Sequence, residues 1–121
     1  MARILIVDDA ELVRMKLKEM LHQMNCDVCE AENGEVALDV YEVESPNLVI
    51  CDINMPVMDG VTFLRELMAQ HPDALVVMLS STDDQEILMQ CLLLGAQAYL
   101  RKPFDPETTY NTLHDILGSL L

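Results

Sequence analysis

The sequence has few basic residues and no long apolar run. Lysine and arginine number 7 against 21 aspartates and glutamates, which gives a formal net charge of −14 over 121 residues. Because binding to a nucleic-acid backbone requires clustered lysine and arginine, we expect no direct nucleic-acid partner. No apolar stretch approaches the ~20 residues that a transmembrane helix requires, so we expect no membrane partner either.

Tryptophan is absent, and no secretory signal is visible. Aromatic residues make up 4% of the chain and hydrophobic residues 51%, so the core must consist mainly of aliphatic side chains and methionine. The chain begins MARILIVDD, with an acidic pair where a signal peptide has its small-residue cleavage site, and this start predicts a cytoplasmic protein. The length fits a single domain, residues 1–121, that is large enough to bury a substantial core.

Cysteine is also scarce, with only Cys26, Cys29, Cys51 and Cys91. Without a secretory signal we expect reduced thiols. Cys26 and Cys29 form a C-x-x-C motif, which in redox proteins opens a helix. Here the motif falls at a predicted turn entering a strand, and neither a second cysteine pair nor a nearby histidine completes a zinc site. We therefore expect structural or incidental cysteines, with redox or metal function as the alternative.

Short apolar runs alternate with longer helical patterns along the whole chain. Five runs are too short for helices and are expected to be strands, at residues 3–7, 27–31, 47–51, 74–79 and 98–100. Helical spacing predicts helices at about 12–24, at 34–43, from Gly60 onward with Asp59 as N-cap, from Asp83 to Gly95, and at about 105–120. The strands are continuously apolar rather than alternating, so both faces of the sheet are covered and the strands are parallel. This pattern predicts an α/β fold.

Polar side chains gather where the predicted strands end. In chain order they are Asp8 and Asp9, then Asp52, then Ser80 and Ser81, then Lys102 and Pro103. Ligands of open parallel sheets bind outside the carboxyl ends of the strands, so we expect these groups to converge. Three nearby carboxylates repel one another unless a cation balances them, and oxygen ligands suit Mg²⁺. With a lysine and a hydroxyl beside it, an aspartate is a competent nucleophile toward a phosphoryl group.

Four segments carry family signatures in the right order: LIVDD at 5–9, DINMPVMDG at 52–60, LSS at 79–81 and GAQAYLRKPF at 95–104. With these segments the chain resembles the receiver domains of two-component response regulators over essentially its whole length, and especially the single-domain chemotaxis type. The resemblance implies a flavodoxin-like, doubly wound (βα)5 fold with a five-stranded parallel sheet in the order 2-1-3-4-5. It implies a sensor histidine kinase or phosphotransfer protein as partner. It implies no enzymatic activity beyond self-phosphorylation and slow autodephosphorylation.

The resemblance also assigns roles to individual residues. Asp52 would be the phosphoacceptor, assisted by Lys102 and Ser80. Mg²⁺ would be held by Asp9, Asp52 and the backbone carbonyl of Asn54, with Asp8 acting through a bound water. Further implied features are phosphoryl-binding backbone amides at Ile53 and Ser81, switching by Ser80 and Tyr99, a cis Lys102–Pro103 peptide bond, and an influence of Asn54 and Thr82 on the phosphate lifetime.

The fourth helix predicts an outward apolar surface. At 3.6 residues per turn, Ile87, Cys91 and Leu94 share the face toward the sheet. Met89, Leu92 and Leu93 then point outward, where a surface helix normally carries charges. In receiver domains the usual output surface combines helix four, strand five and helix five. We therefore expect homodimerisation or the binding of a downstream protein partner there.

Simpler interpretations remain open at each position. Asp8 and Asp9 could only cap the following helix, and Ser80 could likewise be a cap. Lys102 could be an ordinary surface lysine, and Tyr99 could serve packing alone. Two other functions are a receiver-like binding module that is never phosphorylated, and a hydrolase of the haloacid dehalogenase type. The hydrolase would require D-x-D after the first strand, where this chain has D-D.

Overall fold

The computed structural model describes residues 1–81 and 83–121, and Thr82 lies outside the described residues. The strands are β1 (Arg3–Val7), β2 (Asp27–Ala31), β3 (Leu48–Asp52), β4 (Val76–Ser80) and β5 (Ala98–Arg101). The helices are α1 (Glu11–Gln23), α2 (Gly34–Glu44), α3 (Gly60–Gln70), α4 (Gln85–Leu94) and α5 (Pro106–Leu117), followed by the 3₁₀ turn η1 (Gly118–Leu120). Neighbouring strands are parallel, in the order β2-β1-β3-β4-β5. The predicted fold class and strand order are confirmed.

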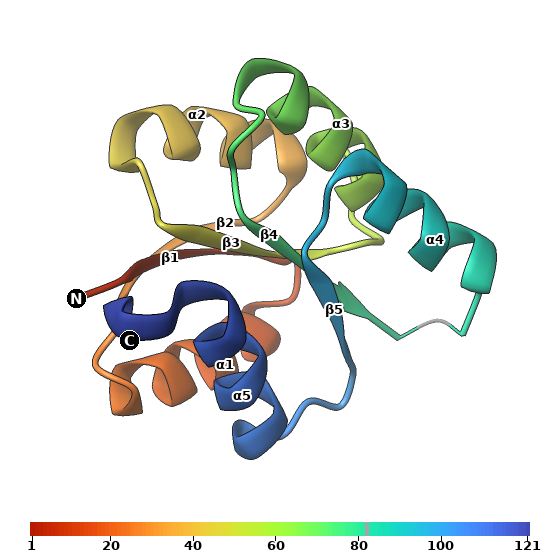
Figure 1. Ribbon diagram of the computed structural model, residues 1–121. Helices are drawn as coiled ribbons and strands as arrows, with labels where there is room; N and C mark the ends of the chain where they lie inside the picture. The colour runs from red at the N-terminus through yellow and green to blue at the C-terminus, as the bar shows by residue number, and fades with distance from the viewer. Residues whose placement is uncertain (82) are drawn as a thin grey trace.

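Two helical layers cover the sheet (Figure 1). Helices α1 and α5 lie on one face, and α2, α3 and α4 lie on the other. Successive strand residues point to opposite faces, so Ile4 and Ile6 join the core of the first layer while Leu5 and Val7 join that of the second. Because neither face of the central strands β1, β3 and β4 meets water, these strands are almost fully buried, which explains their apolar runs. The edge strands β2 and β5 carry exposed polar residues such as Asp27 and Arg101. In residues 1–81 and 83–121, no helix is long and apolar enough to cross a membrane.

Helix α4 begins later than the sequence predicted. Its N-cap is Asp84, whose carboxylate accepts hydrogen bonds from two amides of the first turn, so the helix starts at Gln85 rather than near Asp83. Asp83 instead forms an ion pair with Arg101 at the end of β5. The sequence alone does not distinguish Asp83 from Asp84 as the N-cap, because both are aspartates. The path of the backbone decides between them.

Other element bounds also differ from the prediction. The register pairs Val49 with Val76, so β4 starts there rather than at residue 74. Strands β3 and β4 include Asp52 and Ser80 as their last residues rather than ending before them. The last predicted helix ends at Leu117. Two polar groups of the predicted site are therefore residues of the sheet itself.

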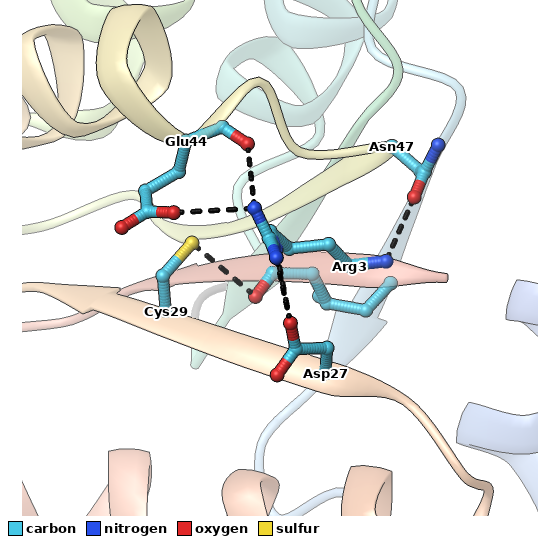
Figure 2. A network of polar contacts seen from close by, with 6 residues as sticks. Arg3, Asp27, Cys29, Glu44 and Asn47 are labelled. Atoms are coloured by element: carbon cyan, nitrogen blue, oxygen red, sulfur yellow. Dashed lines mark hydrogen bonds and ion pairs between the residues drawn. The ribbon is translucent and has the colours of Figure 1, made fainter. Parts of the chain in front are cut away.

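The amino edge of the sheet is fixed by Arg3, the first residue of β1 (Figure 2). Its Nε and Nη2 each lie 3.0 Å from the Asp27 carboxylate at the start of β2. Its Nη1 lies 3.2 Å from both the carbonyl and the carboxylate of Glu44, the last residue of α2. The Arg3 amide donates a 2.7 Å hydrogen bond to Asn47, just before β3. This network ties the amino ends of three strands together, so the polar groups at the carboxyl ends form a separate site.

Candidate functional site

Three carboxylates meet at the carboxyl ends of β1 and β3. Asp8 and Asp9 follow β1 directly, and Asp52 ends β3. The two strands are neighbours, and their register pairs Val7 with Cys51, so Asp8 and Asp52 lie at the same level of the sheet. One carboxylate oxygen from each of the three aspartates lies within 4.8 Å of the others. The structure thus brings together the acidic residues that the sequence places at the strand ends.

Lys102 brings a positive charge to these carboxylates from the end of β5. Its Nζ lies 2.9 Å from Asp8 Oδ2 and 3.4 Å from Asp52 Oδ1. Its amide donates a 2.8 Å hydrogen bond to the carbonyl of Ser80, which continues the β4–β5 pairing. The peptide bond to Pro103 is cis, as the resemblance implied. The Lys102 side chain is only 21% exposed and is paired twice, so the surface-lysine interpretation is wrong.

Burial makes the negative charge of this site unfavourable. Asp8 is 0% exposed and Asp52 is 6% exposed. Burial raises the pKa of Asp52 and the charge of Asp8 raises it further, while Lys102 acts in the opposite direction. Burial lowers the pKa of Lys102, but the hydrogen bond to Asp8 and the charge of Asp52 outweigh that effect, so the Lys102 pKa is raised overall. One ammonium therefore balances the carboxylates only in part, and a second cation would stabilise the site.

Neither acid of the Asp8–Asp9 pair caps helix α1. The N-cap residue is Ala10, and no side chain accepts a capping hydrogen bond there. Asp8 Oδ1 accepts a 2.9 Å hydrogen bond from the Ala10 amide, and Arg14 Nη1 donates a 2.5 Å hydrogen bond to the Asp8 carbonyl. Asp9 is exposed. Capping therefore does not account for the two successive acids.

The loop 53–59 between β3 and α3 is closed at its base by Gly60. The Gly60 amide donates a 2.7 Å hydrogen bond to the Ile53 carbonyl. A Cβ on Gly60 would lie 2.0 Å from the Asp52 carbonyl oxygen, so only glycine fits there. Asp59 caps α3, as predicted. The close approach of Gly60 to the Asp52 carbonyl was not predicted from the sequence.

The remaining residues of the predicted site lie around this loop and the ends of β4 and β5. Ser80 and Ile53 are buried, whereas Asn54, Ser81 and Tyr99 are exposed. The register pairs Asp52 with Leu79 and Ser80 with Arg101, which places Ser80 one step beyond Asp52 on the neighbouring strand. Tyr99 is 38% exposed and belongs to neither of the two buried core clusters. Thr82 lies outside the described residues.

The donor set fits a hard divalent cation. All three acidic groups offer carboxylate oxygens, which are the ligands that Mg²⁺ prefers, and two of them are buried beside a single ammonium. The same edge presents an aspartate nucleophile and a lysine, which are the parts required for phosphoryl transfer to a side chain. The arrangement therefore suits a bound divalent cation with an aspartate and a lysine beside it.

The C-x-x-C motif lies away from this site. Cys26 precedes β2, Cys29 lies within β2, and all four cysteines are free thiols. Burial raises the pKa of Cys29 to about 11 and also raises that of Cys26. Redox C-x-x-C motifs depend on a lowered thiol pKa, so these two cysteines lack the property that such chemistry requires.

Helix α4 exposes the apolar residues that the sequence predicted. Met89, Leu92 and Leu93 are 56%, 40% and 81% exposed. The buried face of α4 differs from the predicted one in one respect. Its fully buried residues are Cys91, as predicted, and Leu88, which was not predicted to face the sheet. Ile87 and Leu94 pack only partly buried against the same core.

Comparison with known proteins adds independent evidence. Residues 4–114 match the family model for the response regulator receiver domain. The chain is 38% identical over 117 residues to the chemotaxis protein CheY of Bacillus subtilis, covering 96% of this chain and 98% of that protein. A similar solved structure is the CheX–CheY–BeF3–Mg²⁺ complex from Borrelia burgdorferi, with a TM-score of 0.92, 28% identity, and coverage of 96% of this chain and 89% of that chain. Another is the chemotaxis protein CheY4 of Vibrio cholerae, with a TM-score of 0.90, 31% identity, and coverage of 96% and 98%.

Proposed function

Because this chain belongs to the family of response regulator receiver domains, we propose that it accepts a phosphoryl group on Asp52 from a sensor histidine kinase or phosphotransfer protein. The observation that carries the proposal is the meeting of Asp8, Asp9 and Asp52 within 4.8 Å, with the Lys102 ammonium beside two of them. The single-domain organisation over residues 1–121 and the cytoplasmic location stay predictions.

In the proposed transfer, a carboxylate oxygen of Asp52 attacks the phosphorus of a phosphohistidine. The new P–O bond forms as the P–N bond breaks, and the electron pair returns to the imidazole nitrogen, which then takes a proton from solvent. Lys102 lies 3.4 Å from Asp52 Oδ1, close enough to neutralise charge on the incoming phosphoryl oxygens. The Ser80 hydroxyl and the amides of Ile53 and Ser81 would donate hydrogen bonds to the same oxygens.

We include Mg²⁺ as the cofactor of this reaction. Asp8, Asp9 and Asp52 would supply its side-chain oxygens, Asp8 through a water, and Asn54 would supply a backbone carbonyl. When bound, Mg²⁺ would neutralise charge on the phosphoryl oxygens. The CheY of Borrelia burgdorferi occurs in a complex with BeF3 and Mg²⁺, and that composition supports the same cofactor here.

Incubation with acetyl phosphate and Mg²⁺, followed by intact mass spectrometry, tests the phosphoacceptor. The native protein should gain one phosphoryl group, and Asp52→Asn should gain none. The proposal fails if the native mass does not change, or if Asp52→Asn gains mass to the same extent.

The metal is tested by titration of Mg²⁺ in the absence of phosphodonor. Binding should be weak, because Mg²⁺ retains its waters, and Asp9→Ala should abolish both binding and phosphorylation. Asp39→Ala on the exposed side of α2 removes the same charge and should change neither. Phosphorylation that persists in Asp9→Ala would place the metal elsewhere.

We also propose that phosphorylation controls the surface formed by α4, β5 and α5. Its apolar centre consists of Met89, Leu92 and Leu93. An exposed apolar patch on an acidic protein more often indicates a protein–protein contact than a chance grouping of side chains. Phosphorylation would draw Ser80 inward, allow Tyr99 to follow, and shift an existing equilibrium at this surface. The result would be a homodimer or a complex with a downstream protein partner.

Sedimentation with and without beryllium fluoride, which mimics the phosphoryl group, tests this surface. Association should appear with the mimic and should be lost in Leu93→Glu. Leu12→Glu on α1 is the matched control, since Leu12 is equally apolar and exposed but lies on the other helical layer. An unchanged mass with the mimic, together with partner binding that survives Leu93→Glu, would show that the output surface lies elsewhere.

A further inference from the structure

The amino end of α2 lies against the loop that follows β3. The Gly34 amide donates a 3.1 Å hydrogen bond to the carbonyl of Met58, in the second half of this loop. A Cβ on Gly34 would lie 2.9 Å from the Met58 carbonyl oxygen, from Met58 Cγ and from Phe63 Cβ. Such distances are well below normal van der Waals separation, so any side chain at Gly34 must displace the loop or α3.

Backbone conformation does not explain this glycine. Among the described residues, the glycines with positive φ are Gly95 and Gly118, so the backbone of Gly34 is open to other residues. Glycine is also a poor helix former. The close approach of Met58 and Phe63 is therefore the physical reason for glycine at the start of α2.

The position of Gly34 is itself fixed by its neighbour. Asn33 is the N-cap of α2 and is largely buried, and its Oδ1 accepts a 2.9 Å hydrogen bond from the Val36 amide. Such a cap holds the first turn of the helix in one orientation. The Gly34 amide is consequently presented to the loop by the capped first turn of a helix.

Beyond Ile53, the loop 53–59 packs against the core through Met55 and Met58, which are partly buried. Most of its residues after Ile53 are exposed. Val57 has a φ of +68°, a left-handed conformation that a β-branched residue adopts only when its surroundings impose it. Gly60 fixes the base of the loop at Ile53, and the Gly34–Met58 contact fixes its far side. Asn54 lies between these two anchors.

We propose that Gly34 is a positioning residue for the Mg²⁺ site, acting through Met58 on the loop that carries the Asn54 carbonyl. The inference rests on the proposed function, because it takes Asn54 as a metal ligand. Contacts that orient metal ligands from outside typically change metal affinity by roughly 10- to 100-fold when they are removed. Gly34→Ala should therefore raise the Mg²⁺ concentration for half-maximal phosphorylation roughly tenfold, at the lower end of that range. The rate at saturating Mg²⁺ should change much less.

The experiment compares Gly34→Ala with Glu35→Ala, an exposed neighbour in the same turn. Each variant is phosphorylated with acetyl phosphate over a series of Mg²⁺ concentrations, and urea unfolding reports its global stability. Amide hydrogen exchange of residues 54–58 in Mg²⁺-free protein gives a readout that needs neither metal nor activity. Exchange there should be faster in Gly34→Ala and unchanged in Glu35→Ala. Gly34→Ala/Met58→Ala, which removes the Cγ contact, should recover part of the Mg²⁺ affinity.

A folded Gly34→Ala with native exchange in the loop and a native Mg²⁺ requirement would overturn the inference. If Gly34→Ala does not fold, Asn33→Ala takes its place, and an unchanged Mg²⁺ requirement in that variant would overturn it too. The native protein is measured alongside. If it is not phosphorylated, the proposed function fails, while the exchange comparison still decides whether Gly34 positions the loop.

Discussion

The ammonium of Lys102 lies 2.9 Å from Oδ2 of Asp8, a carboxylate that is fully buried and stands 94 positions earlier in the chain. The segment that follows β5 thus brings a cation to a buried carboxylate at the end of β1. Breaking a buried pair by removing one partner leaves an uncompensated charge, which is more destabilising than the pair is stabilising.

Lys102→Gln should accordingly lower the free energy of unfolding by about 3 kcal/mol at neutral pH without Mg²⁺. Added Mg²⁺ should restore part of the loss, since a ligand that binds only the folded state stabilises it. Urea unfolding measures both effects. Lys16→Gln on the exposed surface of α1 is the control and should stay within about 0.5 kcal/mol of the native protein. Equal losses in the two variants would show that Lys102 does not balance the buried carboxylates.

Asp52 should make the folded state less stable as the pH rises. Burial and the charge of Asp8 raise its pKa, so the folded protein holds this proton more tightly than the unfolded chain does. Stability is thus lost as the pH rises from the ordinary aspartate range through the raised pKa of Asp52, and the loss is complete above that value. Asp52→Asn should remove this loss and raise the urea midpoint at pH 7, but not at pH 3.

The control for this prediction is Asp39→Asn, which changes the net charge equally at an exposed position of α2. All measurements are made without Mg²⁺, because a bound cation would offset the effect. If Asp52→Asn gains no more stability at pH 7 than Asp39→Asn, repulsion within the site is not the cause.

The sequence predicted most of the fold because its signals are local. A continuous apolar run identifies a buried parallel strand, and the run predicted at 3–7 matches β1. The strand predicted at 27–31 also matches β2, although this edge strand contains Asp27 and Glu30. Helix α4 was harder, because QEILMQCLLL is apolar on all sides and its periodicity does not single out one face. Leu88 was therefore missed as a core residue, although Cys91 was found.

The part of the candidate site that follows from the strand topology alone was predictable from the sequence. Parallel strands place their carboxyl ends at one edge, which brings Asp8, Asp52 and Lys102 together from three distant segments. The contacts of Gly34 and Gly60 could not be foreseen, because they depend on how closely two backbones approach after the helices have packed. The sequence shows that a glycine is present, but it does not show which neighbouring atoms leave no room for a side chain.

Cys29 should react slowly with alkylating reagents in the folded protein. Burial raises its pKa to about 11, and its thiol points to the Ile4 carbonyl at a distance of 3.8 Å (Figure 2). At pH 8 the thiolate fraction is then roughly 10⁻³, against about a quarter for a free cysteine. Iodoacetamide labelling at Cys29, followed by peptide mass mapping, should be at least about 100-fold slower in the native protein than in urea. Equal rates would contradict the raised pKa and would reopen the redox interpretation of the C-x-x-C motif.

Two adjacent threonines of α5 should respond oppositely to the same substitution. The Thr109 hydroxyl is fully buried and has no hydrogen-bond partner among the described residues, whereas the Thr108 hydroxyl donates a 2.9 Å hydrogen bond to Asp105 at the start of the helix. A buried polar group without a partner costs about 1–3 kcal/mol, so Thr109→Val should raise the free energy of unfolding by about 1 kcal/mol. Thr108→Val should lower it by about 0.5–1 kcal/mol, because it removes a made hydrogen bond. Both variants exchange a hydroxyl for a methyl group on a β-branched residue, so helix propensity is matched and urea unfolding isolates the hydrogen bonding. A loss of stability in Thr109→Val would contradict an unsatisfied hydroxyl at this position.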